Sequence, residues 1–267
     1  MLRRVRLLAI PVVIASLIGI GVTTAQTGAP PDVRYVALGD SYSSGVGAGG
    51  VSSGGDCDRS SNAYPALWAA SHNPENFQFA ACSGAQTEDV LTKQLAALNA
   101  DTTLVSITVG GNDVGYVDVL VACTLEGPLR CASEVNSAED KVRTELPAKL
   151  DRLYGAIAIR APHAEVVVLS YPRLYDVAAA PCPGVLDSSR SRINAGADLL
   201  DDTIATVARR HGFTVADVRP AFAGGHEICD HDSWMSAVEL FAISHSYHPN
   251  QAGQAKGYLP VFAAAAR

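Results

Sequence analysis

The chain has 267 residues, 48% of them hydrophobic and 18% charged, an ordinary globular composition with enough apolar residues for a full core. Acidic residues outnumber basic ones by 27 to 20, so the net charge is −7. This acidic balance, without a basic cluster interleaved with aromatic residues, argues against nucleic-acid binding and other phosphate-binding roles.

The first 25 residues have the pattern of a secretory signal peptide. Three arginines within the first six residues precede an apolar run over 7–22, and small residues up to Ala25 follow it. We expect cleavage after Ala25, although the run is also near the lower length for an uncleaved membrane anchor. Cleavage would leave a short lead-in over 26–32, a net charge of about −10 and a secreted, extracellular protein with no stable membrane anchor.

Short β-rich apolar runs alternate with longer helical patterns along the rest of the chain. The predicted strands cover 34–38, 77–81, 104–109, 165–170 and 214–218. The predicted helices cover 64–71, 87–99, 137–160, 188–211 and 251–265, and Pro147 is expected to kink or divide the third. This alternation predicts one α/β domain over 33–267, with a parallel sheet covered by helices on both faces.

The six cysteines all fall in the predicted mature part, and an even number in an exported chain indicates disulfides. The close C-x-x-C pairs that favour a zinc site do not occur. Composition leaves the pairing open. The simplest pairing is sequential: Cys57 with Cys82, Cys123 with Cys131, and Cys182 with Cys229.

Polar residues able to do chemistry follow three of the predicted strands, where ligands of a parallel sheet bind. The first strand runs into Gly-Asp-Ser, which puts Ser41 in place for a nucleophile, although such a triplet is also a common turn. Gly84, after the second strand, can offer its backbone N–H to an oxyanion. After the third strand, Asn112 offers either an oxyanion donor or a helix cap.

His248 precedes a proline that suits the first position of the last predicted helix. Most single histidines are structural or solvated, but one held at a loop–helix junction is a better candidate for a positioned base. His226 lies in a glycine-rich loop beside Cys229. We interpret it as part of a loop held by a disulfide at Cys229, with substrate contact as the alternative.

Four segments resemble, in order, the four blocks of the SGNH, or GDSL, hydrolase superfamily. They are GDSYSSG at 39–45, the glycine of CSGAQT at 82–87, GGND at 110–113 and HPNQAGQ at 248–254. The resemblance is to its secreted actinobacterial lipases and esterases and spans essentially the whole mature chain. It implies a three-layer α/β/α sandwich with a five-stranded parallel sheet in the flavodoxin-like order 2-1-3-4-5. It implies no metal or organic cofactor.

The resemblance also implies roles for the matching residues. Ser41 would attack an ester carbonyl and form an acyl-enzyme, with His248 as its base. The backbone N–H groups of Ser41 and Gly84 and the side chain of Asn112 would form the oxyanion hole.

One position departs from the family pattern. Many members carry an aspartate three residues before the catalytic histidine, where this chain has His245. Some secreted relatives use a main-chain carbonyl instead, and the carbonyl of Ser246 is the nearest. Asp230 or Asp232 from the preceding loop is the alternative. We therefore expect a Ser–His dyad.

The expected function is a secreted serine ester hydrolase, that is, a lipase or esterase with phospholipases included. Its partner would be an ester or lipid substrate rather than nucleic acid, and it would be a monomer. A carbohydrate acetyl esterase is the alternative within enzymes. A non-catalytic glycan or cell-wall binding module is the alternative outside them, although Ser41, Asn112 and His248 are all present.

Overall fold

The computed structural model describes residues 32–178, 182, 185–238 and 245–266. The predicted signal peptide, and all of the lead-in except Asp32, lie outside the described residues. Within this part of the chain, none of the helices combines the length and the apolar character that crossing a membrane requires.

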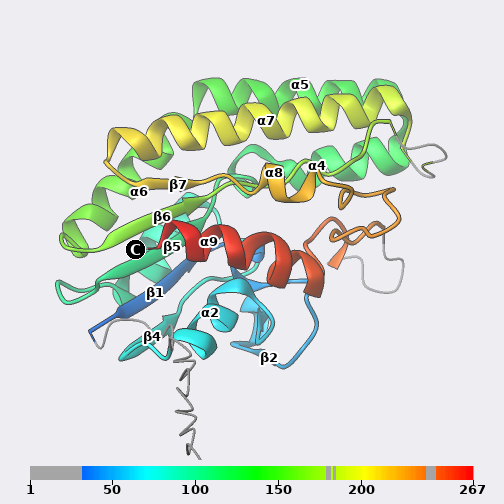
Figure 1. Cartoon of the computed structure of the whole chain (residues 1–267). Helices are drawn as coiled ribbons and strands as arrows, with labels where there is room; N and C mark the ends of the chain where they lie inside the picture. The colour runs from blue at the N-terminus through cyan, green and yellow to red at the C-terminus, as the bar shows by residue number, and fades with distance from the viewer. Residues whose placement is uncertain (1–31, 179–181, 183–184, 239–244, 267) are drawn as a thin grey trace, which may run out of the picture.

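The centre of the molecule is a parallel sheet of five strands in the order β4-β1-β5-β6-β7, which is the predicted order 2-1-3-4-5 (Figure 1). Its strands are β1 (Arg34–Gly39), β4 (Asn76–Phe79), β5 (Leu104–Thr108), β6 (Glu165–Leu169) and β7 (Thr214–Ala216). Central strand β5 is buried along its whole length, as expected for strands that are apolar on both faces. The predicted fold class is confirmed.

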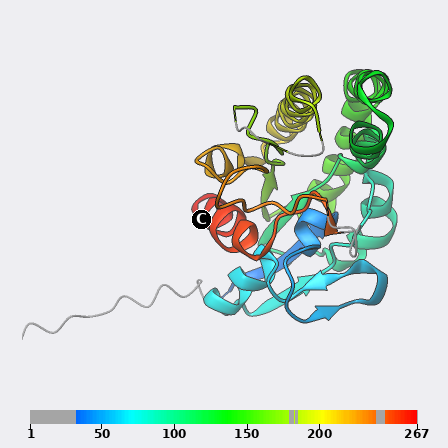
Figure 2. The same ribbon diagram turned by 90° about the vertical axis from the view of Figure 1, so that its right-hand side faces the viewer.

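Helices form the outer two layers (Figure 1 and Figure 2). One face of the sheet is covered by α5 (Pro128–Thr144), α6 (Leu146–Arg160) and α7 (Asp187–Arg210). The other face is covered by α2 (Tyr64–His72) and α9 (Leu259–Ala265). The right-hand side of Figure 1 carries the loops that follow the strands, and Figure 2 turns this carboxyl edge toward the viewer.

Shorter elements line the carboxyl edge and continue the long helices. The short helices and strands are α1 (Ser41–Ser44), β2 (Ser52–Ser53), β3 (Arg59–Ser60), α3 (Thr87–Asp89), α4 (Tyr116–Val121) and α8 (Arg219–Phe222). Turns of 3-10 helix are Gly55–Cys57, Leu95–Ala97 and Asn112–Val114, and π-helical turns are Val90–Gln94, Ala122–Glu126 and Gly253–Tyr258.

The predicted helix over 137–160 was wrong at its start. Helical structure begins with α4 and continues through a π-helical turn into α5. Gly115 and Gly127 both have positive φ, so each forms a turn between successive helices rather than marking a long loop. Pro128 fits the first turn of α5, where its missing N–H costs nothing. The predicted division near Pro147 is confirmed, because α5 ends and α6 begins there.

All six cysteines are in disulfides, and the pairing is the sequential one. Cys57 is bonded to Cys82 with an S–S distance of 2.02 Å, and Cys123 to Cys131 with 2.00 Å. The third bond joins Cys182 to Cys229.

Candidate active site

The nucleophile candidate stands on a turn that only glycine can make. β1 ends at Gly39, whose φ is 121°, and a Cβ there would lie 2.3 Å from the carbonyl oxygen of Thr108. The chain therefore turns sharply, and Ser41 becomes the first residue of α1. Asp40 caps this short helix by accepting the backbone N–H of Tyr42 at 3.0 Å.

The structure brings Ser41 and His248 together from opposite ends of the chain. Ser41 Oγ lies 2.7 Å from His248 Nε2, and His248 Nδ1 lies 2.9 Å from the carbonyl oxygen of Ser246. A proton on Nδ1 donates to that carbonyl, which leaves Nε2 free to accept from the serine hydroxyl. Burial lowers the pKa of His248 to about 4, so the ring is neutral at neutral pH.

An unusual backbone conformation turns the Ser246 carbonyl toward the histidine ring. Tyr247 has a φ of 64°, which is uncommon for a residue other than glycine. Its N–H donates to the carbonyl of Ser236 at 2.9 Å, and Tyr42 Oη donates to its carbonyl at 2.7 Å. The residue after Ser41 thus holds the residue before His248.

The other candidate orienters are engaged in their own loop. Asp230 accepts the N–H of Glu227 at 2.8 Å, and Asp232 accepts the indole N–H of Trp234 at 3.3 Å. His226 stacks on Trp234 with ring centroids 3.5 Å apart, and its Nδ1 lies 2.9 Å from the Asp232 carbonyl. These contacts agree with the interpretation of His226 as part of a loop held by a disulfide.

The strand order places β1, which leads to Ser41, between β4 and β5, so Gly84 and Asn112 follow the two strands that flank it. Gly84 is exposed with a φ of 74°, and nothing lies within 4 Å of the position of a Cβ. The Asn112 side chain donates to the carbonyl of Ala85 at 3.1 Å. A side-chain NH₂ has two protons, so Asn112 keeps a second N–H beyond this bond.

Asp40 has a larger part in this site than the sequence reading assigned to it. Besides capping α1, its carboxylate accepts the hydroxyl groups of Thr108, at 2.7 Å, and of Tyr171. Burial raises the pKa of Asp40 to about 6. In the sequence, the only signal was an acidic residue directly after a mostly apolar strand and beside the nucleophile.

No group of three or more His, Cys, Asp or Glu side chains is placed to hold a metal ion within the described ranges. Those same ranges contain the Ser41–His248 pair at the end of β1, on a sheet of the order 2-1-3-4-5. Together the sheet and the serine block define a hydrolase of the α/β/α type.

Comparison with known proteins gives the family. Residues 37–256 match the GDSL-like Lipase/Acylhydrolase family. Lipase 1 of Streptomyces coelicolor is 50% identical over 248 residues, which cover 92% of each chain. The chain belongs to this family and is a carboxylic ester hydrolase, as the resemblance implied.

Two solved structures are similar over nearly the whole domain. Phospholipase A1 from Streptomyces albidoflavus NA297 is 50% identical with a TM-score of 0.86, over 88% of this chain and 100% of that chain. An extracellular lipase from Streptomyces rimosus is 51% identical with a TM-score of 0.85, over 87% of this chain and 99% of that chain.

Proposed function

We propose that this protein is a secreted lipase or esterase that hydrolyses lipid esters, phospholipids included, through an acyl-enzyme on Ser41. The observation that carries the proposal is the 2.7 Å contact between Ser41 Oγ and His248 Nε2 at the carboxyl edge of the sheet. Its relatives are called lipases and a phospholipase A1, which favours acyl esters of lipids over acetyl groups on sugars.

In the proposed reaction, Ser41 Oγ attacks the ester carbonyl carbon as its proton passes to His248 Nε2. The carbonyl oxygen becomes an oxyanion, which accepts from the N–H groups of Ser41 and Gly84 and from the Asn112 side chain. The bond to the alcohol then breaks, and His248 returns the proton to the leaving alkoxide. The acyl group remains on Ser41.

Water completes the cycle by the same groups. His248 accepts a proton from water as the oxygen attacks the acyl-enzyme, and the released Ser41 oxygen takes that proton back. The fatty acid leaves, and the enzyme is restored. The Ser246 carbonyl holds the ring in the required tautomer throughout, in the role that a carboxylate has in a Ser-His-Asp triad.

The proposal includes export. Residues 1–25 would be removed as a signal peptide, 26–32 would be the lead-in, and 33–267 the hydrolase domain, acting as a monomer. Three disulfides suit an oxidising compartment, and the Streptomyces rimosus relative is described as extracellular. N-terminal sequencing of the protein from culture medium tests the cleavage position.

Hydrolysis of a p-nitrophenyl ester series from acetate to palmitate, by the oxidised mature protein and its Ser41→Ala variant, tests the activity. Cleavage of medium and long chains that is lost in the variant supports a lipase or esterase that depends on Ser41. Cleavage of acetate alone would move the function to an acetyl esterase. A folded wild-type protein no more active than its variant would refute the catalytic assignment.

A further inference from the structure

Exposed apolar side chains are concentrated near the candidate active site. Eight large hydrophobic side chains are exposed among the described residues, and four of them fall within thirteen consecutive positions. These four are Val117, Val121, Leu125 and Leu129, with exposed fractions of 59%, 43%, 74% and 89%. They recur every fourth residue and are called the apolar ridge below.

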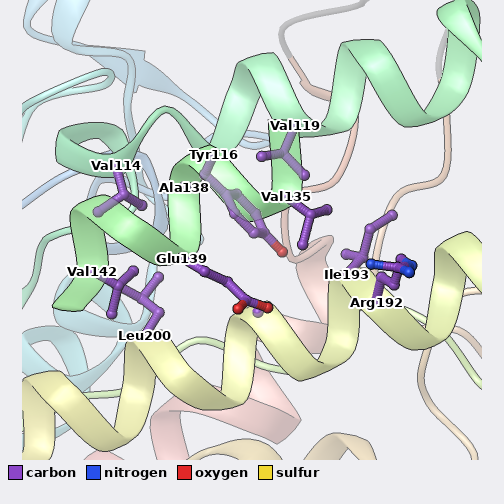
Figure 3. A pocket seen from close by; sticks show the side chains of 11 residues that line it. Val114, Tyr116, Val119, Val135, Ala138, Glu139, Val142, Arg192, Ile193 and Leu200 are labelled. Atoms are coloured by element: carbon purple, nitrogen blue, oxygen red, sulfur yellow. The ribbon is translucent and has the colours of Figure 1, made fainter. Parts of the chain in front are cut away.

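The core of the protein does not need the apolar ridge. The inner side of α4 already supplies Val119, which points with Tyr116 into a small apolar pocket between α4, α5 and α7 (Figure 3). The facing helices contribute Val135 from α5 and Leu200 from α7 to the same pocket. Packing of α4 is therefore achieved by its inner face, and the ridge residues remain outside it.

A disulfide holds the most exposed part of the ridge in place. Cys123 and Cys131 are bonded and themselves buried, and the loop that they close contains both Leu125 and Leu129. Gly127 turns the chain between them with a φ of 87°. The disulfide therefore limits the movement of this loop and keeps both leucine side chains exposed.

The same loop is attached to the candidate catalytic residues. Thr124 Oγ1 lies 2.6 Å from the hydroxyl of Tyr247, the residue before His248. At the other end, the N–H of Tyr116 donates to the carbonyl of Gly111, the residue before Asn112, at 3.1 Å. The ridge thus extends outward from the helix that joins the oxyanion donor to the base.

The charged residues around the ridge favour binding to a lipid surface that carries no net negative charge. Asp118, Glu126 and Glu134 flank it with three carboxylates. Arg130 is shared between Glu126 at 3.1 Å and Glu134 at 2.8 Å, so its guanidinium is neutralised locally. These acidic groups would repel anionic lipids and attract the trimethylammonium groups of choline.

We propose that the apolar ridge is the surface by which the protein docks on a zwitterionic phosphatidylcholine aggregate, which brings the lipid ester to Ser41. This inference rests on the proposed lipase function. Val117, Val121, Leu125 and Leu129 enter the interfacial region of the lipid, and the disulfide keeps their arrangement fixed during entry.

The test compares Leu125→Gln/Leu129→Gln with Ile159→Gln as a matched control. Ile159 is 82% exposed at the end of α6, at the amino edge of the sheet and away from the ridge. Both variants are placed on a Ser41→Ala background in the oxidised mature protein. Co-sedimentation with phosphatidylcholine vesicles then reports binding without hydrolysis.

The double variant is expected to lose about 10- to 100-fold in vesicle partitioning because two leucines no longer enter the lipid, while the control stays within about twofold of the parent. On the Ser41-containing background, hydrolysis of vesicle phosphatidylcholine should fall with binding. Hydrolysis of p-nitrophenyl butyrate, tested below its solubility limit, should be unchanged in the double variant, and this unchanged rate also shows that the variant is folded.

Four results would overturn the inference: equal binding by the double variant and its parent, equal loss in the control, tighter binding to phosphatidylglycerol vesicles, or a dimer in sedimentation velocity that the double variant abolishes. Failure of the proposed function looks different. In that case the wild type leaves the soluble ester intact, and vesicle binding by the Ser41→Ala protein still decides the role of the ridge.

Discussion

Replacing Tyr42 by phenylalanine removes one hydroxyl group from the link between the two halves of the candidate dyad. Tyr42 Oη donates to the Tyr247 carbonyl at 2.7 Å, and both residues are buried. The ring itself is kept, including its contacts with His248 at 5.3 Å and with Tyr171 at 5.0 Å between centroids. The substitution therefore leaves one buried carbonyl without its donor and changes little else.

An unsatisfied buried carbonyl costs about 1–3 kcal/mol. That peptide group leads directly into His248, so we expect the histidine ring to lose part of its fixed position. If the whole cost appears in the chemical step, kcat falls by about 5- to 150-fold. KM should stay within about twofold, because the Tyr42 side chain is buried against Tyr247, Tyr171 and His248.

The assay is kcat and KM on p-nitrophenyl butyrate, with the free energy of unfolding measured in urea. Tyr258→Phe is the matched control, because its hydroxyl donates to the Ser170 carbonyl at 2.9 Å and the side chain is fully buried. Both variants should lose similar stability, but only Tyr42→Phe should lose kcat. In that variant the acid limb of kcat/KM should also move upward, as the freed His248 ring becomes more hydrated. Equal kcat losses in the two variants, or a change confined to KM, would refute this reasoning.

Four further predictions concern the same site and its support. Burial lowers the pKa of His248 to about 4, and the ring must be neutral to act as a base. We therefore expect kcat/KM to stay level from pH 8 to about 5 and to halve near pH 4. A fall in kcat/KM at pH 6–7 would contradict this expectation. The unfolded chain binds a proton on this residue at an ordinary pKa of 6.5, so its contribution to stability should fall as the pH drops from 6.5 to about 4. Asn112→Ala should lower kcat by about 10²- to 10³-fold with little change in KM, and a purely KM effect would remove it from the oxyanion hole. Replacing Cys57 and Cys82 by alanine should lower the free energy of unfolding by about 3.5 kcal/mol, because their bond closes a loop with a separation of 25 residues. Urea titration measures this loss. A loss below about 1 kcal/mol would show that the disulfide does not constrain the unfolded chain in this way.

Much of the fold could be predicted because its strands are short, apolar and separated by clear helical patterns. The sheet order came from the resemblance, which also related Gly84, Asn112 and His248 to Ser41. Helix α4 was missed because Gly115 and Gly127 suggest a loop, and only the structure shows each of them as a turn between helices.

The supporting contacts of the site could not be predicted, since they join residues far apart in sequence. The Tyr42–Tyr247 hydrogen bond spans 205 residues, and the Asp40–Tyr171 contact spans 131. Neither pair follows a local pattern, and a tyrosine beside a serine or a histidine is equally compatible with simple core packing. The positive φ of Tyr247 could not be predicted either, because a positive φ is usually indicated by a glycine in the sequence.

The left-handed turn at Tyr247 has a consequence for how this site can vary. A carboxylate orienter is encoded by one codon and is lost by one substitution, whereas the Ser246 carbonyl is present whichever side chain stands at that position. A side-chain substitution at Ser246 therefore does not remove this carbonyl. What must be inherited is the path of the main chain, held by Ser236 and Tyr42, so selection on the histidine's partner acts at positions other than the partner itself.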